Sequence, residues 1–171
     1  MLIDELDKEP NDKFGYGVRY HKVLAFGEFL SSCTLLATRL SDSVDVSATF
    51  LVSTSATIPS GTSTNGSKTT IINTAVNHGQ TGWKAGDWVM NASRGWMAQI
   101  KDIRMTTNPN HTLVFDEQAV AAGAGDTYYC QKAIATLQAG ATGERIKVRF
   151  RAVTSLANQF EDDILVNVKD F

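Results

Sequence analysis

The sequence contains little cysteine. Its 171 residues include two, Cys33 and Cys130, and neither is followed by a second cysteine or a histidine within four residues. Close spacing of that kind places two zinc ligands on one turn, so the sequence has no zinc-binding pattern. We expect two buried free thiols, because an unpaired cysteine usually behaves as a small hydrophobic residue. A disulfide between them would require Cα atoms within about 7 Å and stays open at this point.

The chain also lacks a basic block and a long apolar run. The chain has 16 Lys and Arg residues and 18 Asp and Glu residues, which gives a net charge of −2. Capture of nucleic acid or of an anionic membrane needs clustered Lys and Arg, so we expect neither partner. No 18 apolar residues run together, and residues 1–10 are acidic, unlike a signal peptide. We therefore expect a soluble protein made in a cytoplasm.

Patterns that carry catalysis or hold a cofactor are missing as well. The glycine-containing segments 61–68 and 123–126 lack the Gly-Lys-Ser/Thr order that cradles phosphate, and no Gly-x-Ser-x-Gly motif occurs. Asp162 and Asp163 are adjacent, so on a strand they point to opposite faces and are better explained as solubilising charges than as a catalytic or calcium-binding pair. Three isolated histidines are expected to be packing or surface residues: His21, His78 and His111. We expect no catalytic, cofactor-binding or metal-ligating residues.

What the sequence does contain favours strands over helices. Three prolines and 13 glycines accompany 30 serines and threonines. Threonine fits a pleated surface, and both hydroxyl residues compete with helical hydrogen bonds. Apolar and polar residues alternate over 43–52 and over 144–153, the period of half-buried strands. A third alternating stretch, 163–169, follows a turn at 155–162, so the C-terminal region is predicted to be a hairpin.

The first strand of this hairpin has two distinct faces. Its inward residues are expected to be Ile146, Val148, Phe150 and Ala152, and its outward residues are Arg145, Lys147, Arg149 and Arg151. Alternate residues on a strand lie about 6.6 Å apart, so this basic row could span phosphates or meet acidic residues of another subunit. A solvated sheet face is the plainer interpretation.

The middle of the chain reads as a loop followed by short strands. Residues 53–70 include 11 serines and threonines and too few apolar residues to order by burial, so we expect an exposed loop. Turn residues then separate short strands over 88–133, which suggests a small barrel. Helix candidates are limited to residues 4–9, a short segment, and residues 21–30, which contain Gly27.

Two separated stretches resemble a known family. The first comprises KEPNDKFGYGVRY at residues 8–20 and FGEFLSSCTL at residues 26–35, and the second spans residues 135–170. Together they resemble the beginning and the end of small tailed-phage virion proteins known as fibre-tail adaptors. Tyr20 stands where that family usually has tryptophan. The likeness includes no catalytic motif.

The resemblance implies an all-β protein whose main domain is an immunoglobulin-like β-sandwich. In the family the two stretches are nearly contiguous, whereas here a long segment intervenes from an exposed Ser/Thr-rich connection, where insertion is tolerated. We therefore expect a discontinuous sandwich made of residues 1–57 and 134–171. Residues 58–133 would form an inserted, small β-barrel-like domain.

The resemblance also implies a structural role in a virion, without enzymatic activity. The expected function is that of an adaptor at the head-to-tail or tail-to-fibre junction, acting through contacts with other virion proteins (connector, tail, fibre or major capsid protein) and with copies of itself. A capsid decoration protein on the outer shell is the close alternative. A carbohydrate-binding module and a glycan-cleaving enzyme are remote ones, the latter because no spacing brings two carboxylates together.

Candidate partner-binding residues fall in two groups. The first lies in or beside a proposed N-terminal docking arm, residues 1–14, which cannot bury its apolar side chains alone: Leu2, Ile3, Leu6, Phe14 and Tyr16. A frayed terminus is the equal alternative. The second group comprises Trp83, Trp88 and Trp96, because tryptophan is enriched at interfaces. Core packing of the inserted domain is the competing explanation for them.

Overall fold

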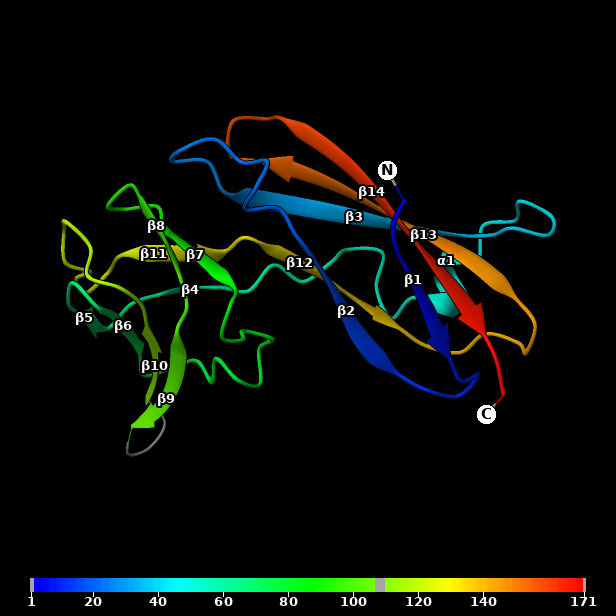
Figure 1. The fold of residues 1–171 in the computed structure, drawn as a ribbon, viewed down its shortest axis with the longest axis horizontal. Coiled ribbons are helices and arrows are strands. Elements are labelled where there is room, and N and C mark those ends of the chain that lie inside the picture. Colours follow the sequence, from blue (N-terminus) through cyan, green and yellow to red (C-terminus); the bar gives the residue numbers. More distant parts are fainter. Residues whose placement is uncertain (1, 107–109, 171) are drawn as a thin grey trace. The chain divides into compact units, whose positions relative to one another are not determined.

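The structure, a computed structural model, describes residues 2–106 and 110–170. It is nearly all β, with 49% strand and 2% helix, which confirms the predicted fold class (Figure 1). The elements are β1 (Leu2–Lys8), β2 (Phe14–Arg19), β3 (Leu30–Arg39), α1 (Ser47–Phe50), β4 (Ser60–Thr62), β5 (Asn65–Gly66), β6 (Thr70–Asn73), β7 (Trp88–Asn91), β8 (Trp96–Gln99), β9 (Asp102–Thr106), β10 (Asn110–Val114), β11 (Thr127–Cys130), β12 (Lys132–Leu137), β13 (Arg145–Thr154) and β14 (Gln159–Val168).

The chain divides into two compact units. Unit 1 comprises Met1–Val18, Ser31–Thr57 and Ala133–Phe171, and unit 2 comprises Arg19–Leu30 and Ile58–Lys132. These boundaries depart from the predicted segments mainly at Arg19–Leu30, which we placed in the sandwich.

Contacts within unit 2 explain that departure. The Tyr20 N–H donates to the Gln131 carbonyl at 2.9 Å, and the Phe29 ring stacks on Tyr129 with centroids 4.2 Å apart. The helix considered for residues 21–30 is wrong, because this segment folds as turns in which Gly27 has a φ of +83°. Glycine adopts that angle without the steric cost that other residues incur.

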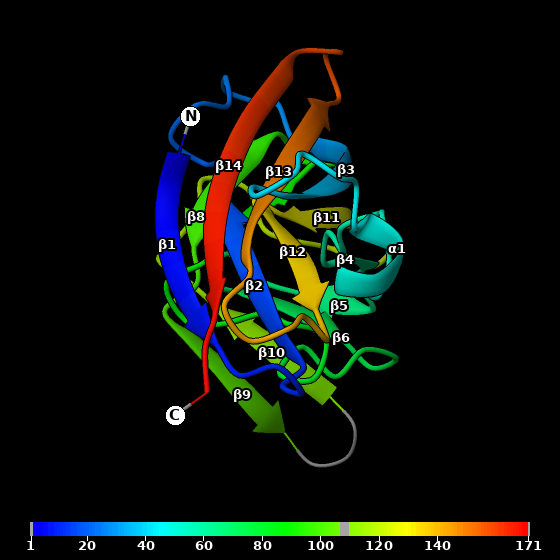
Figure 2. The same ribbon diagram turned by 90° about the vertical axis from the view of Figure 1, so that its right-hand side faces the viewer.

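Unit 1 has one four-stranded sheet in the order β1-β14-β13-β3 (Figure 2). The predicted C-terminal hairpin is confirmed: β13 and β14 pair antiparallel, with a turn shorter than expected at residues 155–158. The inward assignment is also confirmed, since the predicted apolar residues are all at most 1% exposed: Ile146, Val148, Phe150, Ala152, Ile164, Val166 and Val168. Alternation was a reliable signal here because one face of the sheet is buried.

The second layer of unit 1 consists of β2 and β12. Residues 51–57 then join the two layers, because their backbone groups bond alternately to both. The Val52 N–H donates to the Thr136 carbonyl of β12 at 3.0 Å, and the Ala56 N–H donates to the Cys33 carbonyl of β3 at 2.8 Å. One side of the sandwich is thereby closed by backbone hydrogen bonds.

The N-terminal segment is part of this sandwich rather than a free arm. Residues 2–8, where we expected a docking arm overlapping a possible short helix, form β1 and pair parallel to β14. The buried Lys8 ammonium, 2% exposed, donates to the carbonyls of Glu9 (2.6 Å), Pro10 (3.2 Å) and Ala139 (2.7 Å). Three acceptors match the three protons of a lysine ammonium. Lys8 therefore ties the end of β1 to the connection between β12 and β13.

The strand predicted over residues 43–52 is wrong. Residues 47–50 form α1 instead, because Asp45 accepts the Ser47 N–H at 2.8 Å and the Ser47 hydroxyl accepts the Ala37 N–H at 2.8 Å. Short polar side chains that bond nearby backbone offer the chain an alternative to a strand ladder.

The exposed loop predicted over residues 53–70 is also wrong. This segment contains β4, β5 and the first residue of β6. Its order comes from backbone bonds rather than burial: the Ser63 N–H donates to the Asp126 carbonyl, and the Thr64 N–H donates to the Ile72 carbonyl, both at 2.8 Å.

Unit 2 contains two four-stranded sheets, ordered β5-β6-β10-β9 and β4-β11-β7-β8. In the part of the chain that the structure describes they form no closed barrel, so the barrel-like insert is instead a pair of open sheets. Both sheets contribute to one hydrophobic cluster: Ile71, Trp83, Val89, Trp96, Ala98, Ile100, Leu113, Phe115, Ala122, Tyr128 and Cys130.

Replacing the buried ammonium tests its role in unit 1. Lys8→Met keeps most of the side-chain volume but leaves three carbonyls without their donor, so we expect a loss of about 2 kcal/mol in the free energy of unfolding. Urea denaturation followed by circular dichroism measures it. Lys13→Met, at an exposed position, is the control and should change stability by less than about 0.5 kcal/mol. Equal effects of the two substitutions would contradict the assignment.

Candidate docking surfaces

The predicted contact residues of the N-terminal region lie at the surface of unit 1 or partly buried in it. Leu2 is 58% exposed and Ile3 is 38% exposed, while Leu6, Phe14 and Tyr16 are half-buried. The Tyr16 hydroxyl on β2 donates to the Asp4 carboxylate on β1 at 2.6 Å. The structure thus brings β1 and β2 together at one side of the sandwich.

The tryptophans are placed differently from the interface prediction. Trp83 and Trp96 are 2% and 8% exposed and belong to the core of unit 2. Trp88 is half-buried and stacks on His21, with centroids 5.3 Å apart. Trp83 and Trp96 are therefore packing residues, and neither offers a face on which a sugar could stack.

The cysteines and one histidine are internal. Cys33 and Cys130 are free and buried, and burial raises the pKa of each thiol to about 12. His78 is fully buried, and its Nε2 lies 2.9 Å from the Tyr128 hydroxyl, which also accepts a bond from Asn73. Burial raises the pKa of Tyr128 to about 12. His111 lies where side chains fall outside the described part of the structure.

Two of the four residues in the basic row of β13 form ion pairs within their own sheet. Arg149 donates to Asp163 at 2.8 Å, and Arg151 donates to Glu161 at 2.8 Å. The hydrogen bond from Arg149 lowers the pKa of Asp163, whereas burial raises the pKa of neighbouring Asp162. Asp162 and Asp163 thus have different surroundings, as expected for adjacent strand residues whose side chains point to opposite faces of the sheet.

The described residues contain neither a metal-binding cluster nor a membrane-spanning helix. Over residues 2–106 and 110–170, no three His, Cys, Asp or Glu side chains gather closely enough to hold a metal ion. Within the same residues, no helix has the length and apolar character needed to cross a bilayer.

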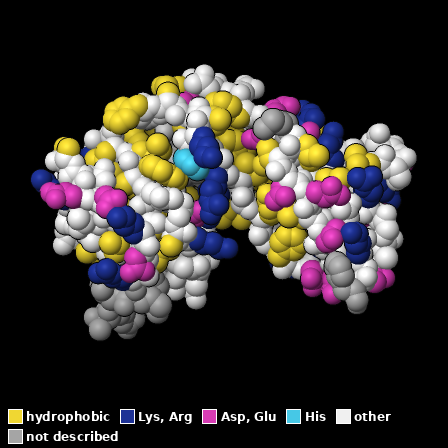
Figure 3. Space-filling view, in the orientation of Figure 1, with side chains coloured by type: hydrophobic (Ala, Val, Ile, Leu, Met, Phe, Trp, Pro, Cys, Tyr) yellow, Lys and Arg dark blue, Asp and Glu magenta, His cyan; other side chains and the backbone are white. Residues whose placement is uncertain are grey.

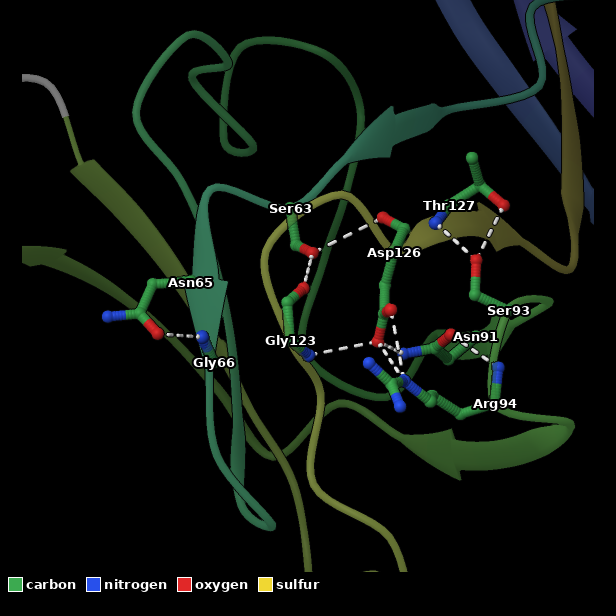
Figure 4. Close-up of polar contacts among 9 residues, drawn as sticks. All are labelled: Ser63, Asn65, Gly66, Asn91, Ser93, Arg94, Gly123, Asp126 and Thr127. Carbon is green, nitrogen blue, oxygen red and sulfur yellow. Dashed lines mark hydrogen bonds and ion pairs between the residues drawn. The ribbon is translucent and has the colours of Figure 1, made fainter.

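Asp126 organises a buried polar cluster in unit 2 (Figure 4). Its carboxylate accepts bonds from the Arg94 Nε at 2.9 and 3.0 Å, from the Asn91 side chain at 3.1 Å and from the Gly123 N–H at 2.9 Å. The Ser63 hydroxyl donates to the Gly123 carbonyl. Burial by itself raises the pKa of Asp126, but these hydrogen bonds and the Arg94 charge outweigh it, so that the pKa lies below its ordinary value. The cluster fixes the turn before β11.

The most exposed aromatic side chain among the described residues belongs to Phe26, at 86%. It lies in Arg19–Leu30, which we name the Phe26 loop. Backbone bonds hold the loop, since the N–H groups of Val23 and Leu24 donate to the Tyr20 carbonyl at 2.9 and 3.3 Å. The Glu28 carboxylate, on a residue only 1% exposed, accepts the Ala25 N–H at 2.8 Å. The Phe26 side chain is therefore exposed to solvent on a loop whose conformation is fixed by hydrogen bonds; we call such a loop braced.

The base of the Phe26 loop is anchored by an ion pair to a buried carboxylate. Arg19 donates to the Asp87 carboxylate at 3.0 Å, and Lys132 also pairs with this carboxylate, which is wholly buried. Lys22 and Val23 are exposed beside the tip. The sequence analysis did not identify Phe26, because it selected interface residues by their being tryptophan. The signal that could have indicated a tight turn at this position was Gly27 and Glu28, which directly follow Phe26.

The outer side of β1 is the second exposed feature. β1 is the edge strand of its sheet, and Figure 3 shows Asp and Glu side chains gathered over the part of unit 1 where β1 and β14 run in Figure 1. Three exposed carboxylates in and after β1 have no Lys or Arg partner among the described residues: Asp4, Glu5 and Glu9. Asp7, in contrast, pairs with Lys169 at 2.8 Å.

Comparison with known proteins places the chain in no family: no family model matches it, and neither does any curated protein sequence.

The Asp126 cluster predicts an acid-sensitive unit 2. The folded pKa of Asp126 lies below its ordinary value of 3.8, so its contribution to stability is complete above that pH and is lost as pH falls through the folded pKa. Asp126→Asn should lower the free energy of unfolding by about 1–2 kcal/mol at pH 7 and flatten its decline below pH 4. Urea titrations between pH 2 and 7 measure both, with exposed Asp102→Asn as control. A wild-type pH profile in Asp126→Asn would contradict this role.

Proposed function

We propose that this protein is a non-enzymatic structural component of a tailed-phage particle. It acts as an adaptor at the head-to-tail or tail-to-fibre junction and works through contacts with other virion proteins. The resemblance to fibre-tail adaptors supports this, since the two resembling stretches contribute most of the strands of unit 1. Lys8 and Pro10, both in the first resembling stretch at residues 8–20, meet in the contact of the Lys8 ammonium with the Pro10 carbonyl.

The observation that carries the proposal is the braced Phe26 loop. Leaving a phenylalanine ring in water forgoes about 1.5–3 kcal/mol that burial would supply. Because the loop is held by its own backbone, by Glu28 and by the Arg19–Asp87 pair, a partner that buries Phe26 loses little conformational entropy. Pre-organised aromatic side chains of this kind are the anchors that dominate protein–protein affinity.

An electron microscopy experiment locates the protein. Particles of the phage that encodes the chain would be labelled through a tagged copy, and the position of the label scored. Label at the neck or tail supports the adaptor role. Label spread over the shell makes the protein a capsid decoration protein, and particles without label contradict the proposal.

Phe26→Ala tests the anchor. The substitution removes a side chain that contacts mainly water, so stability should change by less than about 0.5 kcal/mol. Incorporation into particles, measured by quantitative immunoblotting of purified virions, should fall at least about tenfold. Val120→Ala, at a 48% exposed apolar residue of the same unit, should incorporate normally. Wild-type incorporation of the Phe26 variant would rule out this loop as the docking contact.

A further inference from the structure

The backbone of β1 has one unsatisfied side. The Lys8 carbonyl accepts the Lys169 N–H at 2.8 Å, so the Lys8 peptide groups face β14. Successive residues of a strand direct their backbone groups to opposite sides, which turns the groups of Asp7 and Glu5 away from β14. Among the described residues no strand pairs with that outward side. The Glu5 N–H is bonded only to the neighbouring Asp4 carboxylate, at 2.9 Å.

The two faces of β1 have different chemistry. Glu5 and Asp7 are exposed on the outer face, where both accept bonds from Asn167 of β14. Leu6 is half-buried and Lys8 is buried on the inner face. A strand laid beside β1 would therefore place one set of alternate side chains against carboxylates and the other set against an apolar side chain.

The charge on this edge is only partly compensated among the described residues, in contrast to the sheet interior. On β14, Glu161 and Asp163 are matched by Arg149 and Arg151 of β13. Among the described residues, Asp4 and Glu5 have no such cation, and Asp7 has a single one, Lys169. An added strand with basic residues would give β1 the cross-strand pairing that β14 already has, and opposite charges in that arrangement stabilise a sheet.

We propose that the outer edge of β1 binds an extended segment of a second protein in which Lys or Arg alternates with apolar residues. The segment becomes a fifth strand beyond β1, with its cations beside Glu5 and Asp7 and its apolar side chains beside Leu6. This mode of recognition takes affinity from main-chain hydrogen bonds and specificity from alternate side chains. The inference rests on the proposed function, because it names the chemistry of a docking partner.

A second copy of the chain does not fit the same edge. Antiparallel pairing of two β1 strands would place Asp4, Glu5 and Asp7 opposite the same set, and like charges opposite each other destabilise a sheet. The basic strand β13 of another copy is not free to serve, since it lies between β14 and β3. Because neither β1 nor β13 of a second copy suits this edge, we assign it to a different protein.

Peptide binding to the full-length protein tests the inference. The probe is a nine-residue peptide alternating Lys or Arg with Val or Ile, and its counterpart carries Glu in place of the basic residues. Fluorescence anisotropy should show binding of the basic peptide, weakened by salt, and no binding of the acidic one. Hydrogen exchange should slow at the Glu5 and Asp7 amides. Protection at other residues, or equal binding of both peptides, would overturn the proposal.

Two substitutions separate charge from backbone. Glu5→Lys should weaken binding of the basic peptide at least about tenfold, because it reverses the charge beside the incoming cations. Glu5→Pro removes the outward N–H without removing a bond to β14, a position at which an edge strand tolerates proline. Glu117→Lys makes the same charge change on unit 2 and should bind normally. If Glu5→Pro does not fold, the exchange data and Glu5→Lys still decide the matter.

A failure of this inference can be distinguished from a failure of the proposed function. Wild-type protein found in particles but unable to bind the basic peptide would overturn this inference alone. Protein absent from particles would overturn the proposed function, even if the peptide bound at β1. Phe26→Ala should leave peptide binding unchanged, because the Phe26 loop belongs to unit 2.

Discussion

The position of β1 depends on one buried ammonium group. Lys8 is the last residue of the strand, and its side chain bonds to carbonyls on both its own turn and the distant Ala139. Its main-chain carbonyl meanwhile accepts the Lys169 N–H. These contacts fix the register of β1 on β14, and register determines which backbone groups and side chains face outward. The open acidic edge is therefore a consequence of how a cation is accommodated inside unit 1, a role of Lys8 that the sequence alone did not reveal.

The sequence was informative where alternation coincided with burial. The hairpin of β13 and β14 could be predicted because its apolar residues repeat every second position and one face is covered. Apolar and polar residues alternate equally well over residues 43–52. Asp45 and Ser47 nevertheless bond to nearby backbone, and the segment forms a short helical turn that the alternation does not predict. The parallel partner of β1 was equally hidden, because the pairing joins segments at opposite ends of the chain and leaves no local trace.

The candidate docking features were less accessible to sequence reasoning. Residue type pointed to tryptophan, but Trp83 and Trp96 fill the core of unit 2, and the most exposed aromatic side chain among the described residues is that of Phe26. Exposure of a ring is set by the loop that holds it, here by Glu28 and the pair of Arg19 with Asp87, and these partners are brought together by folding. Leu2 and Ile3 were predicted to contact a partner from a docking arm; they are exposed, but they belong to the edge strand β1 rather than to a loose arm. The Phe26 loop and the outer edge of β1 have one property in common. Hydrogen bonds hold each of them in a defined conformation, and each remains exposed among the described residues.

The parallel pairing of β1 with β14 also constrains the order in which the chain folds. Glu5 and Asn167, which bond across the two strands, are 162 positions apart. Closing so long a loop is entropically costly and slow, and during synthesis β14 emerges after the other described strands. Most of unit 2 comes from the continuous stretch Ile58–Lys132, so it can fold on the ribosome while β1 still waits for its partner. Until β14 has emerged, the acidic sequence of β1 has no sheet to join, and its carboxylates discourage nascent chains on neighbouring ribosomes from pairing with one another through this segment.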